Sequence, residues 1–177
     1  VSRAVPNTKL LIVGGGQKEH EEGIKDFANE IGLDDCVKFT GAVAYAKLPS
    51  YLSMCDIFAT ASVTEVHPFS VIEGMATGLP ILGIDSPGIS DSISDGETGL
   101  LSADDLASYT AKLTTLCLNK DLQKKMGAAA QQASRQFSIE NTTTIMLGHY
   151  NRLVSNTKPV KPSIEERLRS VLKEFLV

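Results

Sequence analysis

The sequence lacks the features of a membrane-spanning or exported chain. No apolar run approaches the roughly 20 residues that a bilayer-spanning helix needs, and residues 1–6 contain neither the apolar stretch of a signal peptide nor an initiator methionine. We therefore expect a cytoplasmic chain that is a piece of a longer polypeptide. The cytoplasmic face of the membrane is the alternative location.

Tryptophan is absent, cysteine is scarce and positive charge is not concentrated anywhere. The three cysteines, Cys36, Cys55 and Cys117, are odd in number and lack the spacing of metal or redox sites, so we expect plain buried thiols. The formal net charge is −4, and the lysines and arginines are scattered. Without a basic patch the chain has no electrostatic attraction to nucleic acid, so we expect no nucleic-acid partner.

Apolar residues make up 42% of the 177 residues, enough for a hydrophobic core. Short apolar runs typical of buried strands alternate with longer segments of helical period. This order is typical of parallel sheets whose strands are joined by crossover helices. The expected strands are 9–13, 37–40, 57–60, 80–83 and 100–101, and the expected helices are 19–31, 48–55, 69–77, 106–118, 122–137 and 139–154.

We therefore expect an α/β fold: a doubly wound parallel sheet with helices on both faces, Rossmann-like in topology. The segment 91–99 is rich in turn residues and is expected to be a loop. The predicted helix 19–31 has an apolar stripe on one face. Its residues are Ile24, Phe27, Ala28 and Ile31.

The predicted domain covers residues 1–156. Its last helix is expected to begin after Ser138 as the N-cap residue, with Asn141 at the third helical position. Two prolines in residues 157–162 predict a linker, and residues 163–177 predict a terminal amphipathic helix. That helix is expected to dock on protein, with only peripheral membrane contact as the alternative, because its glutamates offset most of its positive charge.

A proline precedes the predicted helix 69–77. Pro68 is expected in the first turn, where its missing N–H is tolerated. This would leave the amides of Phe69, Ser70 and Val71 free to bind an anion such as phosphate at the positive end of the helix.

Two carboxylates flank that helix start, Glu65 on the loop before it and Glu73 about one turn into it. Both would repel a bound phosphate, so their expected partners are hydroxyl donors such as those of a sugar. Two other interpretations remain open on spacing alone. The pair could be the acid and base of a glycoside hydrolase, or both residues could simply stabilise the positive end of the helix.

Three consecutive glycines, residues 14–16, follow the first expected strand. They do not complete the dinucleotide-binding pattern G-x-G-x-x-G, which would need glycine where Glu19 stands. The turn either lets the next helix pack closely or lets the backbone of Gly15 and Gly16 approach a ligand. The sequence leaves both open.

Several segments closely resemble the carboxyl-terminal domain of family 4 retaining glycosyltransferases of the GT-B fold, also called glycosyl transferases group 1. The match includes the E-x7-E signature of that family, formed here by Glu65 and Glu73, and covers roughly residues 5–154. The segments that carry it are 5–16, 37–43, 62–65, 73–82, 88–101 and 137–140.

The resemblance implies a binding site for a nucleoside-diphosphate sugar. Glu65 would be the catalytic residue that holds the hydroxyls of the donor sugar, and Glu73 would hold the ribose diol. His67 would contact phosphate or only fill the turn. No cofactor and no metal are implied. The other donor-binding residues would be Gly15, Gly16, Ala42, Val43, Phe69, Ser70 and Val71.

The chain also departs from the family pattern. Glu-Gly-Phe-Gly is common at the first acid, whereas Val66, His67 and Pro68 follow Glu65 here, and Ser70 replaces a glycine. The family's Arg and Lys that neutralise the diphosphate precede the strand at Lys9 and have no match. The amino-terminal acceptor-binding domain has no counterpart either.

We therefore expect the donor-binding half of a glycosyltransferase, with little or no transferase activity alone. Its expected partners are the nucleoside-diphosphate sugar and the missing acceptor-binding domain of the same enzyme. The alternatives are a non-catalytic nucleotide-binding or regulatory α/β module, and a GT-B sugar-nucleotide epimerase.

Overall fold

A computed structural model describes residues 1–156, in which strands and helices alternate. The strands are β1 (Leu10–Ile12), β2 (Val37–Phe39), β3 (Phe58–Ala59), β4 (Ile81–Ile84) and β5 (Gly99–Ser102). The α-helices are α1 (Lys18–Glu30), α2 (Leu48–Leu52), α3 (Phe69–Ala76), α4 (Ile89–Ser92), α5 (Leu106–Leu118), α6 (Lys120–Ser134) and α7 (Ile139–Asn156). Two 3₁₀-helices, η1 (Tyr45–Lys47) and η2 (Arg135–Phe137), complete the order.

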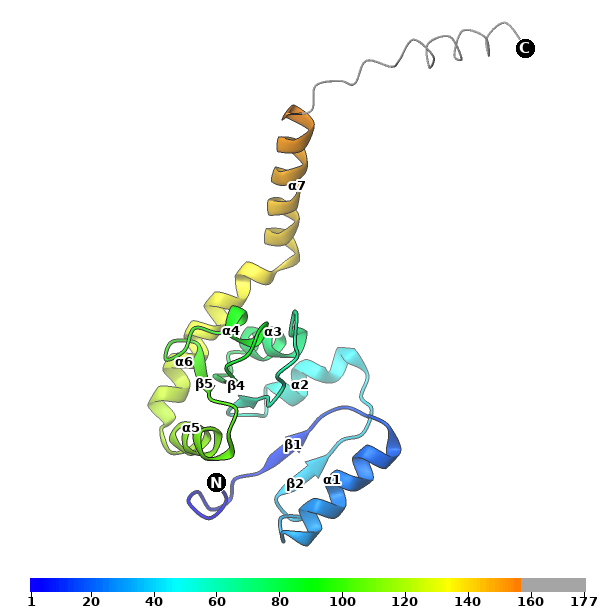
Figure 1. Ribbon diagram of the computed structural model, residues 1–177, viewed down its shortest axis with the longest axis vertical. Coiled ribbons are helices and arrows are strands. Elements are labelled where there is room, and N and C mark those ends of the chain that lie inside the picture. The colour runs from blue at the N-terminus through cyan, green and yellow to red at the C-terminus, as the bar shows by residue number, and fades with distance from the viewer. Residues whose placement is uncertain (157–177) are drawn as a thin grey trace, which may run out of the picture. The chain divides into compact units, whose positions relative to one another are not determined.

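All paired strands run parallel, and they form two sheets (Figure 1). β1 pairs with β2, with Leu10 opposite Val37. β4 lies between β3 and β5, so that Ile81 is opposite both Phe58 and Gly99. Within residues 1–156 no ladder of hydrogen bonds joins one sheet to the other. The parallel pairing confirms the predicted α/β class.

The core lies on both faces of β4, all four residues of which are buried. Successive side chains of a strand point to opposite faces. Ile81 belongs to a cluster that includes Met75 of α3 and Ile89 of α4, whereas Leu82 belongs to a cluster with Leu116 of α5. Helices therefore cover both faces of this sheet, as predicted.

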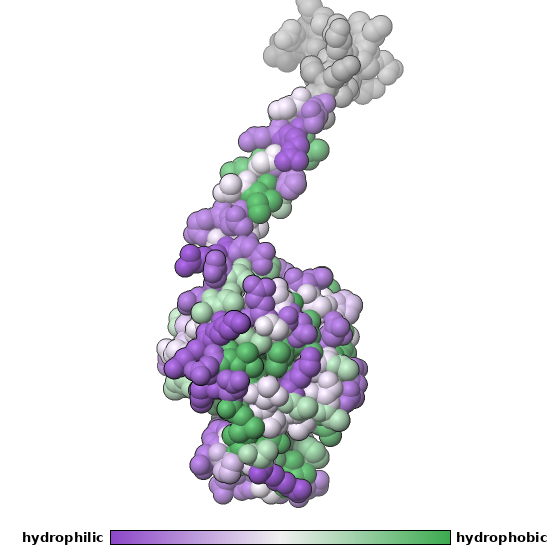
Figure 2. Space-filling view, turned by 90° about the vertical axis from the view of Figure 1, so that its left-hand side faces the viewer, coloured by the Kyte–Doolittle hydropathy of each residue, from purple (hydrophilic) through white to green (hydrophobic). Residues whose placement is uncertain are grey.

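The apolar stripe of α1 is mostly exposed. Of its four residues only Ala28 is buried, whereas the exposed fraction is 61% for Phe27 and 50% for Ile31. The partner sheet explains this exposure, because β1 and β2 have three residues each and offer too little surface to cover the stripe. Apolar patches on the compact body are also visible in Figure 2.

Several helix bounds differ from the sequence prediction, and the differences at α4 and at the start of α6 have clear causes. The short helix α4 (Ile89–Ser92) overlaps the first two residues of the expected loop 91–99, because Ile89 and Ile93 are buried in the core and fix that turn. α6 begins at Lys120 rather than Leu122, because the Asn119 side chain accepts a hydrogen bond from the Leu122 N–H at 2.9 Å and caps the helix start.

The described chain divides into two compact units, Val1–Phe137 and a second that begins at Ser138. In the second unit Ser138 Oγ accepts a hydrogen bond from the Asn141 N–H at 3.2 Å, so the predicted cap of α7 is confirmed. The predicted linker 157–162 and terminal helix 163–177 lie outside the described residues. The three cysteines, which were predicted to be buried, are only partly buried. Nowhere in residues 1–156 does a helix combine the length and apolar character that crossing a membrane requires.

Candidate functional site

Glu65 lies on the loop between β3 and α3, and neighbouring loops hold it. Its Oε1 accepts a hydrogen bond from Ser62 Oγ at 2.9 Å. The carbonyl oxygen of Ser62 accepts another from Ser86 Oγ at 3.3 Å, and Ser86 follows β4. Loops after two adjacent parallel strands therefore position this half-buried carboxylate.

Gly88 packs directly on the backbone of Glu65. An ideal Cβ built on Gly88 would fall on the Glu65 carbonyl oxygen and lie 2.7 Å from its carbonyl carbon. Gly88 also has a φ of 80° and a ψ of −45°, a conformation that L residues with a side chain rarely adopt. The close approach therefore requires glycine, and it connects the β4–α4 loop to the loop of Glu65.

Glu73 is the fifth residue of α3 and is half-buried. Its Oε1 accepts a hydrogen bond at 2.7 Å from the hydroxyl of Tyr45, the first residue of η1. This hydrogen bond, and secondly the negative charge of Glu73, raise the pKa of Tyr45, so the hydroxyl remains a donor at neutral pH. The contact connects the segment after β2 with α3.

The start of α3 offers fewer free amides than the sequence predicted. Pro68 is the residue before the helix, and its φ of −78° and ψ of 84° are close to an inverse γ-turn. As that turn requires, the Phe69 N–H donates to the His67 carbonyl at 3.0 Å. The Val71 N–H donates to the Pro68 carbonyl at 3.0 Å. The prediction of three free amides is therefore wrong: of these three N–H groups, only that of Ser70 has no acceptor in the described residues.

His67 is exposed, and its ring makes edge contacts with two aromatic rings. The ring centroids are 4.9 Å apart for Phe69 and 5.9 Å apart for Phe137. These contacts support a role in holding the turn. A contact of His67 with phosphate stays a prediction.

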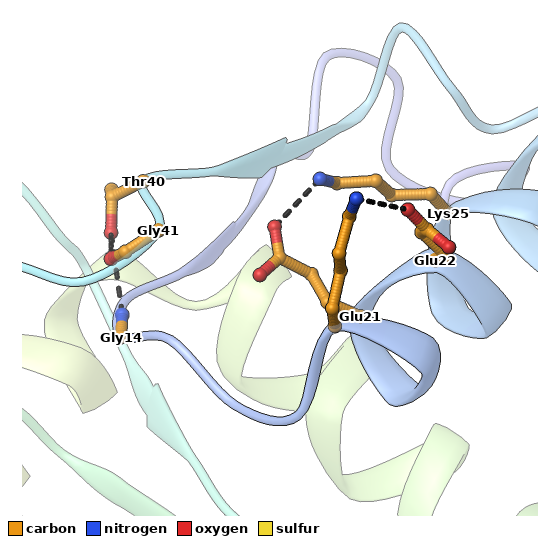
Figure 3. Close-up of polar contacts among 7 residues, drawn as sticks. Gly14, Glu21, Glu22, Lys25, Thr40 and Gly41 are labelled. Atoms are coloured by element: carbon orange, nitrogen blue, oxygen red, sulfur yellow. Dashed lines mark hydrogen bonds and ion pairs between the residues drawn. The ribbon is translucent and has the colours of Figure 1, made fainter.

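The turn after β1 contacts the segment after β2 (Figure 3). The Gly14 N–H donates to Thr40 Oγ1 at 3.3 Å. A Cβ on Gly15 would lie 3.1 Å from the Ala42 nitrogen, so the missing side chain allows close packing between the two turns. Gly16 has open space around its Cα. The structure thus brings Gly15 and Ala42 together. The helix that follows this turn, α1, carries an ion pair between Glu21 and Lys25.

Both carboxylates remain available to hydroxyl donors. In the described part of the chain neither Glu65 nor Glu73 forms an ion pair, and no group of three His, Cys, Asp or Glu side chains could hold a metal ion. The two acids accept hydrogen bonds from different donors, Ser62 and Tyr45. The surface recess between α1 and β2 involves other residues: Lys25, Ala28, Asn29, Asp34, Val37 and Phe39.

Sequence reasoning missed three residues that hold the two acids. Ser62 lies three residues before Glu65 and could have been recognised as a local hydrogen-bond donor. Gly88 follows a proline, which marks a turn but not its contact. Tyr45 is 28 positions from Glu73, and no local signal links them.

Parallel sheets with helices on both sides match the fold of solved GT-B glycosyltransferase structures. The structure of HepE from Anabaena in complex with UDP is similar in fold, with a TM-score of 0.73 and 22% identity over 87% of this chain and 43% of that one. The family of glycosyl transferases group 1 matches residues 1–133. The chain belongs to this family, as the resemblance predicted.

Curated relatives support the same assignment. The D-inositol 3-phosphate glycosyltransferase of Gordonia bronchialis is 29% identical over 84% of this chain and 33% of its own length. The GDP-mannose-dependent alpha-(1-6)-phosphatidylinositol monomannoside mannosyltransferase of Mycobacterium tuberculosis is 31% identical over 75% of this chain and 36% of its own length. The chain thus spans about a third of the length of these relatives.

Proposed function

We propose that this chain is the donor-binding half of a retaining glycosyltransferase, which moves a sugar from a nucleoside-diphosphate sugar to an acceptor. One observation carries the proposal. Glu65 and Glu73 flank the start of α3, and each accepts a hydrogen bond from a hydroxyl group, Glu65 from Ser62 on its own loop and Glu73 from Tyr45 on a distant segment. Neither forms an ion pair in the described residues. Carboxylates held in this way are suited to accept hydrogen bonds from hydroxyl groups.

Each part of the site has a proposed role. Glu65 would hold the hydroxyls of the donor sugar, and Glu73 would hold the ribose diol. The diphosphate would lie at the start of α3, where the free N–H of Ser70 and the positive end of the helix favour an anion. Gly16 and Val43 would border the nucleotide, together with the packed pair Gly15 and Ala42.

The reaction would depend mainly on electrostatic stabilisation of the departing diphosphate by fixed dipoles and by cations from outside residues 1–156. The acceptor site would belong to a separate domain of the complete enzyme. We therefore propose little or no transfer by this chain alone and a cytoplasmic location, where nucleotide sugars would be its substrates.

The relatives suggest which nucleotides to test. The Mycobacterium tuberculosis relative depends on GDP-mannose by name, and the HepE structure contains UDP. Because these nucleotides differ in the base, calorimetry with both UDP and GDP is the direct test. The variants are Glu65→Gln and Glu73→Gln, which remove the charge but keep an acceptor oxygen, and Glu30→Gln is the matched control at an exposed position of α1.

We expect the wild type to bind at least one of the two nucleotides. Charge-assisted hydrogen bonds are about 1 kcal/mol stronger than neutral ones, so Glu73→Gln should weaken binding of the nucleotide about fivefold to tenfold. Glu65→Gln should weaken the binding of the sugar nucleotide but not that of the nucleotide alone. UDP-glucose and GDP-mannose are the sugar nucleotides for this measurement. Absence of binding to every nucleotide at millimolar concentration, or equal losses in Glu30→Gln, would refute the proposal.

A further inference from the structure

Tyr45 is exposed, yet its hydroxyl is held on one acid of the candidate site. The exposed fraction of this residue is 78%, so packing does not fix the ring. Among the described residues, its side chain makes one polar contact, the 2.7 Å hydrogen bond to Glu73 Oε1. An exposed tyrosine that is tied to a carboxylate in this way restricts the orientations of both side chains.

This contact leaves acceptor capacity on Glu73. A carboxylate has about four lone-pair sites on two oxygens. Tyr45 uses one of them, and no ion pair in residues 1–156 uses the others. A neighbouring pair of ligand hydroxyls can therefore bind to Glu73 while Tyr45 stays in place.

We propose that Tyr45 is a positioning residue that fixes the carboxylate of Glu73 in the orientation needed by a ribose diol, and so makes the site selective for ribonucleotides. This inference rests on the proposed function of Glu73. It goes beyond that function because it assigns the selectivity for ribonucleotides to Tyr45, which is not one of the two acids and lies on a different segment of the chain. Tyr45 acts only through Glu73 and contacts no reacting atom.

The physical basis is preorganisation. A glutamate that is free to rotate loses side-chain entropy when it binds a ligand, whereas one already held by Tyr45 has lost part of it before binding. Removing the hydroxyl should therefore weaken ribonucleotide binding by about threefold to tenfold. A nucleotide without the diol makes no use of Glu73 and should not be affected.

The test is calorimetry of wild type and Tyr45→Phe with UDP and GDP and with their 2′,3′-dideoxy analogues. Tyr45→Phe keeps the ring and is not expected to affect folding at so exposed a position. Tyr150→Phe, an exposed tyrosine of α7, is the matched control. A second comparison introduces Tyr45→Phe into Glu73→Ala, where a residue that acts through Glu73 should have no further effect.

The expected result is weaker binding of the ribonucleotide by Tyr45→Phe, unchanged binding of the dideoxy analogue and no additional loss in the Glu73→Ala background. Equal loss for both nucleotides, no loss for either, or a full additional loss with Glu73→Ala would overturn the inference while leaving the role of Glu73 intact. Failure of the wild type to bind any nucleotide would overturn the proposed function itself, and this inference with it.

Discussion

Substitution of Gly88 by alanine tests whether the backbone contact with Glu65 shapes the candidate site. The added methyl group would fall on the Glu65 carbonyl oxygen and lie 2.7 Å from the carbonyl carbon, well inside the ordinary carbon–carbon separation of about 3.5–4.0 Å. The obstacle is backbone, which cannot rotate away as a flexible side chain does. Either Gly88 or Glu65 must therefore move.

Two terms set the expected magnitude. A side chain at the φ of 80° and ψ of −45° of this residue costs about 1–3 kcal/mol, and overpacking costs another 1–3 kcal/mol or so. Gly88→Ala should thus lower the free energy of unfolding by about 2–6 kcal/mol. Gly96 has a nearly equal φ of 79° but open space around its Cα. Gly96→Ala should therefore show only the conformational cost of about 1–2 kcal/mol.

Urea denaturation followed by circular dichroism measures both variants. Because both residues have nearly the same positive φ, the difference between the two losses reports mainly the steric term at Gly88, together with any difference in conformational cost. If Gly88→Ala and Gly96→Ala lose the same stability within about 0.5 kcal/mol, the close approach to Glu65 is not tight and the reasoning fails.

Three further predictions concern stability. Met75→Ala removes a side chain with an exposed fraction of 0% and should cost about 2–5 kcal/mol, whereas Phe27→Ala, at 61% exposed, should cost less than about 1 kcal/mol. Burial raises the pKa of Tyr109 to about 12 in the folded state, from about 10 in the unfolded state. Between pH 10 and 12 the folded protein therefore keeps a proton that the unfolded chain has lost, so the free energy of unfolding falls as the pH rises. The full shift corresponds to about 2.7 kcal/mol, reduced to roughly 1 kcal/mol because the ring is only half-buried. Asp105→Ala removes the cap that accepts the Ser108 N–H at 2.8 Å and should cost about 0.5–2 kcal/mol.

Matched measurements decide each of these predictions. Equal losses for Met75→Ala and Phe27→Ala in urea denaturation would contradict the described burial. Tyr109→Phe should lose less stability than the wild type between pH 10 and 12, and identical pH profiles would refute the argument. Asp104→Ala, beside the cap but without a capping bond, is the control for Asp105→Ala, and equal effects would exclude capping.

Local patterns explain which elements were predicted correctly. The cap of α7 at Ser138 depends only on residues within four positions, and the structure contains the predicted bond. The parallel class followed from the alternation of short apolar runs with helical segments, and every observed strand pair is parallel. Local patterns could not show whether the apolar stripe of α1 is buried. Whether Phe27 is buried depends on the surface that other elements offer, not on the helix itself.

The candidate site shows the same division. Glu65 and Glu73 were found from their spacing around a proline-led helix, and the structure keeps both beside the start of α3. The three expected amides were not all free, because the turn at Pro68 uses two of them, and the geometry of such a turn depends on backbone angles that residue types alone leave undetermined.

The amino-acid sequence by itself determined the fold class, the family and the positions of the two acids, because each follows from short-range periodicity and from motif residues close together in the chain. Only the tertiary structure decided what holds those acids. Gly88 reaches Glu65 across 23 positions and Tyr45 reaches Glu73 across 28. Contacts between distant segments arise from how strands and helices pack, so the orientation of each carboxylate is a property of the packed fold.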